Sequence, residues 1–119
     1  MIDDNVPFRE ALAKIIDCRW PLVTIQGASD SIDGLARLKS FLPDLVFVDI
    51  HLPGESGLDL SRKIKYVSPD TIIIAFTSYD LPEYRNAMQE SGIDHFIPKD
   101  AWTGEEMLTL VASVLYPEE

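Results

Sequence analysis

Two short apolar runs, each followed at once by polar residues, constrain the fold of this chain most strongly. Residues 45–50 read LVFVDI and residues 71–78 read TIIIAFTS. Runs of this length that are rich in β-branched residues and bounded by turn signals are typical of strands buried on both faces. Pro53 and Gly54 supply the turn signal after the first run. Such strands indicate a parallel sheet that helices cover on both sides.

Helical patterns alternate with the strand patterns along the whole chain. Apolar residues recur at helical spacing in five segments, at about 8–16, 31–42, 60–67, 81–91 and 107–115. Two further strands are expected, at 22–27 (LVTIQG) and 95–99 (HFIPK). Thr103 and Glu106 have the spacing of a capping box before the last helix. The alternation predicts a single α/β domain over residues 1–119.

Composition narrows the class of protein. The 46% hydrophobic content indicates a folded chain, and Cys18 is the only cysteine, which excludes an internal disulfide and a cysteine-based zinc site. A lone cysteine fits a reducing compartment, so we expect a cytoplasmic protein. No apolar run is long enough to cross a membrane. The net charge of −10 and the scattered basic residues argue against direct binding of nucleic acid.

Polar residues stand where the carboxyl ends of the expected strands fall. They are Asp3, Asp4, Asp49, Thr77 and Lys99. Carboxyl ends of parallel strands meet at one edge of a sheet, so these side chains are expected on one rim. Three neighbouring carboxylates repel one another unless a cation lies among them, and oxygen ligands suit Mg²⁺. A lysine and a hydroxyl beside them complete a site for a phosphoryl group.

Four motifs carry a resemblance to a known family. They are I-D-D at 2–4, D-I-H-L-P-G-E-S-G-L-D at 49–59, F-T-S at 76–78 and F-I-P-K at 96–99. With them, the chain resembles the receiver domain of bacterial two-component response regulators over essentially all of its length. The segment D-N-V-P-F-R-E-A-L at 4–12 further resembles the NarL/FixJ-like branch, whose receivers precede a DNA-binding domain.

The resemblance implies a fold and a chemistry. The fold is a flavodoxin-like, doubly wound parallel sheet with strand order 2-1-3-4-5. Asp49 is implied to be the phosphoacceptor, taking a phosphoryl group from a histidine kinase or a histidine phosphotransfer protein. Asp4, Asp49 and the backbone carbonyl of His51 are implied to ligate Mg²⁺, with Asp3 acting through metal-bound water. Thr77 and Lys99 are implied to bind the phosphoryl oxygens.

The resemblance also implies a conformational switch. Phe96 is expected to turn inward when Thr77 moves toward the phosphoryl group, which reshapes the surface of the fourth helix, the fifth strand and the fifth helix. A phosphorylation-dependent homodimer or a partner contact is the expected output. The chain is expected to catalyse only its own phosphorylation and dephosphorylation, and so is not a conventional enzyme. We expect no output domain within residues 1–119, and such a domain belongs, if anywhere, to a longer parent chain.

Three alternative functions compete with this interpretation. A degenerate receiver that acts as a phosphorylation-independent interaction module is the main rival, although the acidic residues, Thr77 and Lys99 are all present. An aspartyl-nucleophile phosphatase needs a second acid two residues after Asp49, where His51 stands instead. A flavin-binding electron carrier needs a glycine-rich phosphate loop after its first strand, and residues 4–7 read DNVP.

The first strand is expected to be abbreviated. Only Met1 and Ile2 precede the acidic pair, where the resemblance implies four or five apolar residues. We expect a stub strand of two or three residues that still holds Asp3 and Asp4 in place, with strand exchange between two chains as the alternative.

Overall fold

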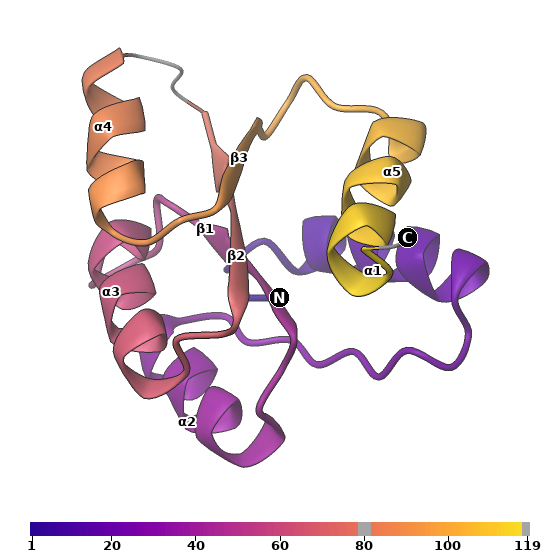
Figure 1. Ribbon diagram of the computed structural model, residues 1–119, viewed down its shortest axis with the longest axis horizontal. Helices are drawn as coiled ribbons and strands as arrows, with labels where there is room; N and C mark the ends of the chain where they lie inside the picture. The colour runs from indigo at the N-terminus through magenta and orange to yellow at the C-terminus, as the bar shows by residue number, and fades with distance from the viewer. Residues whose placement is uncertain (79–81, 118–119) are drawn as a thin grey trace.

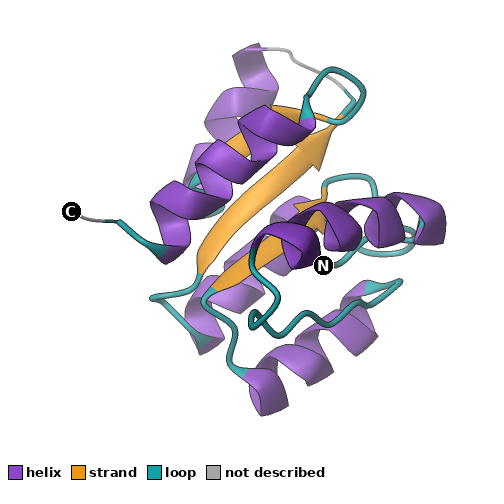
Figure 2. Ribbon diagram, turned by 90° about the vertical axis from the view of Figure 1, so that its right-hand side faces the viewer, coloured by secondary structure: helices purple, strands orange, loops and turns teal. Residues whose placement is uncertain are grey.

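A parallel sheet forms the centre of the computed structural model, which describes residues 1–78 and 82–117. Its strands are β1 (Leu45–Asp49), β2 (Ile72–Thr77) and β3 (His95–Pro98), in the order β1-β2-β3. Asp49 pairs with Phe76, and Thr77 pairs with Pro98. Figure 2 shows the strand arrows running in the same direction. The carboxyl ends of the strands therefore lie at one edge, as the sequence predicts.

Helices cover both faces of this sheet. Figure 1 shows α2 (Ser31–Phe41), α3 (Gly57–Val67) and α4 (Pro82–Glu90) on one side, and α1 (Val6–Arg19) and α5 (Gly104–Leu115) on the other. This arrangement confirms the α/β, flavodoxin-like class. The helix expected over 81–91 is α4, and residue 81 lies outside the described residues. Within the described part of the chain, no helix has the length and apolarity needed to cross a membrane.

The alternation of side chains along β1 divides the core in two. Val46 and Val48 join the cluster that α2, α3 and α4 cover, whereas Phe47 joins the cluster beneath α1 and α5. All three side chains are buried. Because neighbouring residues of a strand point to opposite faces, a strand packed on both sides must be apolar throughout. This explains the uninterrupted apolar run from which the strand was predicted.

Capping residues begin several of the helices. Asn5 accepts a hydrogen bond from the Phe8 amide at the start of α1. At the start of α5, Thr103 and Glu106 each bond the other's backbone amide, which confirms the expected capping box. A capped helix begins at a defined residue, so these caps fix where α1 and α5 leave the edge of the sheet that carries the polar residues.

The N-terminal segment contributes a single bridge residue between two neighbours. Ile2 forms parallel bridges to Ala28 and to Val48. Its amide donates to Phe47 O at 2.8 Å, and its carbonyl accepts from the Asp49 amide at 2.9 Å. On the other side, the Asp3 amide donates to Ala28 O at 3.0 Å. A single bridge residue therefore lies between Ala28 and Val48, where a stub strand of two or three residues is expected. Among the described residues only β1, β2 and β3 form strands, so the full order 2-1-3-4-5 stays a prediction.

The strand expected over residues 22–27 is wrong. These residues form no strand, and only Ala28 makes a bridge. Residues of this segment and of β1 instead line a groove of about 530 Å³. A segment of strand-like sequence forms a ladder only beside a partner, and the one-residue stub supplies too little of one.

Candidate functional site

Three carboxylates gather at the carboxyl edge of the sheet. Asp49 ends β1, and Asp3 and Asp4 follow the bridge residue Ile2. One oxygen from each carboxylate lies within 4.8 Å of the other two. Asp3 and Asp49 are buried, and Asp4 is exposed. The hydrogen bond from the Asp49 amide to Ile2 O ties the two segments together, so the stub strand is sufficient to bring the acidic pair beside β1.

Backbone amides hold one oxygen of each buried carboxylate. The Asn5 amide donates to Asp3 Oδ1 at 2.9 Å, and the His51 amide donates to Asp49 Oδ1 at 3.0 Å. Each amide is two residues after the aspartate that it contacts, a short-range pattern typical of aspartate at a turn. These bonds fix the rotation of the carboxylates and leave the two Oδ2 atoms for other partners.

Lys99 supplies the partner of both Oδ2 atoms. Its Nζ lies 2.9 Å from Asp3 Oδ2 and 3.2 Å from Asp49 Oδ2. Its backbone is fixed as well, because its amide donates to Thr77 O at 2.8 Å and its carbonyl accepts from Trp102 Nε1 at 3.0 Å. The lysine is therefore held at the edge by contacts to its backbone and its side chain.

Burial and neighbouring charges shift the pKa values of Asp3 and Lys99. Burial raises the pKa of Asp3, the Asn5 amide and the Lys99 ammonium oppose the rise, and the Asp49 carboxylate adds to it. Burial lowers the pKa of Lys99, but the hydrogen bonds and charges of Asp3 and Asp49 outweigh it, so that this pKa is raised overall. Lys99 therefore stays cationic at neutral pH.

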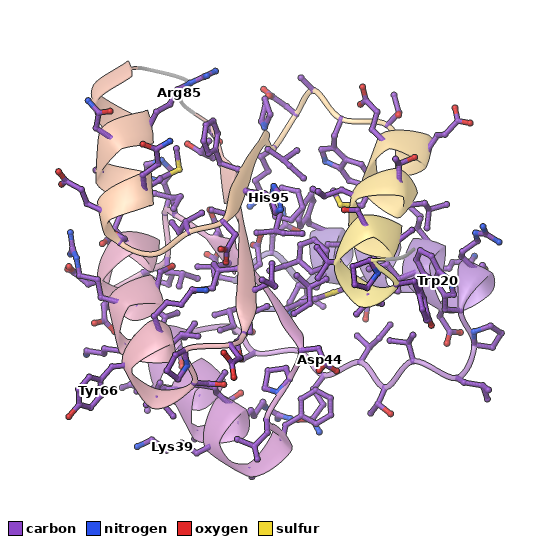
Figure 3. The ribbon with its side chains drawn as sticks, viewed as in Figure 1. Trp20, Lys39, Asp44, Tyr66, Arg85 and His95 are labelled. Atoms are coloured by element: carbon purple, nitrogen blue, oxygen red, sulfur yellow. The ribbon has the colours of Figure 1, made fainter. Side chains whose placement is uncertain are left out.

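Of the remaining predicted residues, Thr77 lies beside this cluster and Phe96 lies away from it. Thr77 is buried at the end of β2, beside the carboxylates along the same edge. Phe96 lies on β3, paired with Ala75, and packs against the cluster under α4. The guanidinium carbon of Arg85, a residue labelled in Figure 3, lies 5.0 Å from the centre of the Phe96 ring. Phe96 therefore lies away from the carboxylates and beneath α4, and the role of the His51 carbonyl stays a prediction.

The donor set fits a hard divalent cation. Its side-chain ligands are oxygens only, which Mg²⁺ and Ca²⁺ prefer. The cluster has three carboxylates, and the Lys99 ammonium contacts two of them, so an excess of negative charge remains. Asp3 Oδ2 is buried and has no hydrogen-bond partner among the described residues by geometric criteria, although the Lys99 ammonium lies 2.9 Å from it. Asp3, Asp4 and Asp49 are therefore suited to hold such a cation.

One residue of the site was not predicted from the sequence as a site residue. Phe8, expected only as part of a helix face, places its ring 4.9 Å from Lys99 Nζ. The available signal is its position in the first turn of α1, directly after the acidic pair. Contact with the far end of the chain depends on how α1 lies against the sheet, which the pattern alone does not fix.

Comparisons with known proteins agree on one family. The model of the response regulator receiver domain matches residues 1–112. Oxygen regulatory protein NreC of Staphylococcus epidermidis is 29% identical over 118 residues, which is 98% of this chain and 53% of that protein. The Staphylococcus carnosus protein of the same name is 29% identical over 113 residues, covering 94% and 52%. The chain thus spans about half the length of the curated relatives it matches.

Solved structures show the same fold. The signal receiver domain of the putative response regulator NarL from Mycobacterium tuberculosis superposes with a TM-score of 0.83 at 25% identity, covering 94% of this chain and 90% of that one. A response regulator protein from Burkholderia pseudomallei, with a phosphorylated aspartic acid, calcium ion and citrate, gives a TM-score of 0.81 at 26% identity, covering 95% and 63%.

Proposed function

The chain belongs to the response regulator receiver domain family, and we propose that Asp49 is its phosphoacceptor in a Mg²⁺-dependent reaction. The family membership and the NreC-like relatives make it a receiver of a two-component system. The identity of the phosphorylated residue, the metal and the partners is the proposal.

One observation carries the proposal. The Asp49 carboxylate lies at the end of a rigid buried strand, 3.2 Å from the Lys99 ammonium and beside the carboxylates of Asp3 and Asp4. A divalent cation bound by these carboxylates would join the Lys99 ammonium in supplying the positive charge that phosphoryl oxygens need. The family relation adds support, because the Burkholderia pseudomallei protein is described with a phosphorylated aspartic acid and a calcium ion.

The proposed transfer moves one phosphoryl group. An Asp49 carboxylate oxygen attacks the phosphorus of a phosphohistidine, the new P–O bond forms as the P–N bond breaks, and the histidine nitrogen keeps the electron pair and is then protonated. A bound Mg²⁺ supplies neutralisation of the charge on the phosphoryl oxygens. Asp4, Asp49 and the His51 carbonyl would hold that cation, with Asp3 acting through metal-bound water. Lys99 and Thr77 bind the phosphoryl oxygens.

The proposal includes the partners and the output. The phosphodonor is a histidine kinase or a histidine phosphotransfer protein, and the signal leaves through the surface of α4, β3 and α5. Phosphorylation-dependent dimerisation is one form of that output. A DNA-binding domain in a longer parent chain is another, supported by the resemblance to the NarL/FixJ-like branch. The domain boundaries 1–119 and the cytoplasmic location stay predictions.

A single experiment separates this function from that of a phosphorylation-independent interaction module. The protein is incubated with Mg²⁺ and acetyl phosphate, and its intact mass is measured. We expect one added phosphoryl group on the wild type and none on Asp49→Asn. Equal labelling of the variant would show that Asp49 is not the acceptor, and an unlabelled wild type would favour the interaction module.

A further inference from the structure

The aromatic ring of Phe8 lies against the Lys99 ammonium of the proposed phosphoryl site. Lys99 Nζ is 4.9 Å from the centre of the Phe8 ring. A lysine ammonium within about 6 Å of an aromatic face is attracted by the negative potential of that face. The same ammonium lies 2.9 Å from Asp3 Oδ2 and 3.2 Å from Asp49 Oδ2. Lys99 therefore has three attractive neighbours, one of which is uncharged.

The ring is itself held in place. Phe8 packs edge-on against Phe76 with 4.9 Å between the ring centroids, and its centroid lies 6.1 Å from that of Trp102. Its amide donates to Asn5 Oδ1 at 3.0 Å, and the Asn5 amide in turn donates to Asp3 Oδ1. The ring and the Asp3 carboxylate are thus connected through the first turn of α1, so they meet Lys99 as one rigid unit.

The side chain of Lys99 needs such a support. Its backbone is fixed by Thr77 O and by Trp102 Nε1, but four methylene groups separate that backbone from the ammonium. Asp3 Oδ2 is the closer of the two carboxylate oxygens. Without a third neighbour, a flexible ammonium would settle on Asp3 and leave Asp49.

We propose that Phe8 is a positioning residue, which holds the Lys99 ammonium within reach of both Asp3 and a phosphoryl group on Asp49. The proposal rests on the function proposed above for Asp49. In this proposal, Phe8 acts on the phosphoryl group and on the carboxylates through its contact with Lys99.

Ring fluorination tests the role without changing the packing. Phe8 is replaced by phenylalanines with one to three fluorines on the ring, which keep the shape and weaken the negative face. The affinity for beryllofluoride, a phosphoryl mimic, is measured in the presence of Mg²⁺. We expect it to fall stepwise with each added fluorine, by about 2- to 10-fold in total. The half-saturating Mg²⁺ concentration should change less than this affinity, because the proposed action of the ring reaches the carboxylates of Asp3 and Asp49 only through Lys99.

Matched variants separate positioning from packing. Phe8→Leu should weaken beryllofluoride binding and Phe8→Tyr should restore it. Phe47→Leu, which removes another ring stacked on Phe76, should leave the affinity unchanged. In NMR spectra, the ε-methylene protons of Lys99 should show an upfield ring-current shift that Phe8→Leu removes.

The outcomes distinguish this inference from the proposed function. If the fluorinated proteins bind beryllofluoride as the wild type does while Asp49→Asn abolishes binding, only the positioning role is wrong. Equal losses in Phe8→Leu and Phe47→Leu, or a Lys99 spectrum without the ring-current shift, would also overturn it. If Asp49→Asn binds the mimic normally, the proposed function fails and the role of Phe8 fails with it.

Discussion

The ammonium of Lys99 lies 2.9 Å from the buried Asp3 Oδ2, although the two residues come from opposite ends of the chain. Lys99→Ala leaves Asp3 and Asp49 without that positive charge. We predict a loss of about 2 to 4 kcal/mol in the free energy of unfolding in metal-free buffer, because a buried charge without its partner is costly. Urea unfolding with and without saturating Mg²⁺ measures it. Mg²⁺ should reduce the loss, and an equal loss in both buffers would argue against a shared cation site.

The exposed Asp4 provides a test of the cation site itself. Asp4→Ala removes one of three neighbouring carboxylates and should weaken Mg²⁺ binding by at least about tenfold, since hard cations depend on the number of charged oxygen ligands. Trp102 contacts the backbone of Lys99, so its fluorescence can follow the titration. Asp70→Ala, an exposed aspartate after α3, is the matched control. Equal half-saturation for all three proteins would contradict the assignment.

The raised pKa of Asp3 predicts a pH dependence with a defined sign. Because burial raises this pKa, the folded state keeps a proton at pH values above 3.8, where the unfolded chain has already lost it. The free energy of unfolding in metal-free buffer should therefore contain a contribution that falls as the pH rises through this range. Asp3→Asn should remove it, as urea midpoints across the acidic range would show. A variant whose pH profile has the wild-type slope there would refute the assignment to Asp3.

The contact between Phe96 and Arg85 defines the position of Phe96 before the proposed switch occurs. The contact of 5.0 Å between the guanidinium and the ring keeps Phe96 packed under α4. If Thr77 couples the phosphoryl group to Phe96, beryllofluoride should change amide exchange across 85–115 in the wild type and much less in Thr77→Ala. Thr109→Ala, on the exposed side of α5, serves as the control. The coupling is wrong if Thr77→Ala responds as fully as the wild type.

The contrast between Asp49 and residues 22–27 shows what sequence patterns can predict here. Asp49 was placed correctly because a strand's apolar run and its terminal residue are local in the sequence, and parallel strands bring their ends together. Residues 22–27 have an equally good strand pattern, but a ladder needs a partner that lies elsewhere in the chain. The Phe8 contact with Lys99 was missed for the same reason, because it depends on how a helix lies on the sheet.

The groove beside β1 leads to the last prediction, which concerns the stub strand. Ile72 N donates to Asp44 O and Ile50 N to Phe76 O, so even-numbered residues of β1 turn their backbone groups toward β2. The backbone amide and carbonyl of Leu45 and the backbone amide of Phe47 therefore turn toward the groove. No strand of the described residues pairs with them there. Asp44, labelled in Figure 3, lines the groove at the start of β1.

The backbone hydrogen bonds of Met1 lie at the edge of this groove. The Ala28 amide donates to Met1 O at 2.8 Å, and the Met1 ammonium donates to Gln26 O at 2.9 Å. These bonds extend the parallel pairing from Ala28 back to Gln26. Extending the chain before Met1 by about three residues, at roughly 3.3 Å each, would bring it alongside Leu45. Ile2 points into the core under α2 and Met1 into the core under α1, so the added side chains would alternate between two apolar clusters.

We therefore predict that adding Val-Ile-Val before Met1 raises the urea midpoint and tightens Mg²⁺ binding. Each buried side chain contributes roughly 1.5 to 3 kcal/mol, and the completed ladder would hold Asp3 and Asp4 more firmly. Gly-Ser-Gly at the same position is the control for added length, and sedimentation excludes dimerisation by strand exchange as the cause. If the apolar extension leaves both quantities unchanged, the groove does not accept a strand, and the irregular course of residues 22–27 needs another explanation.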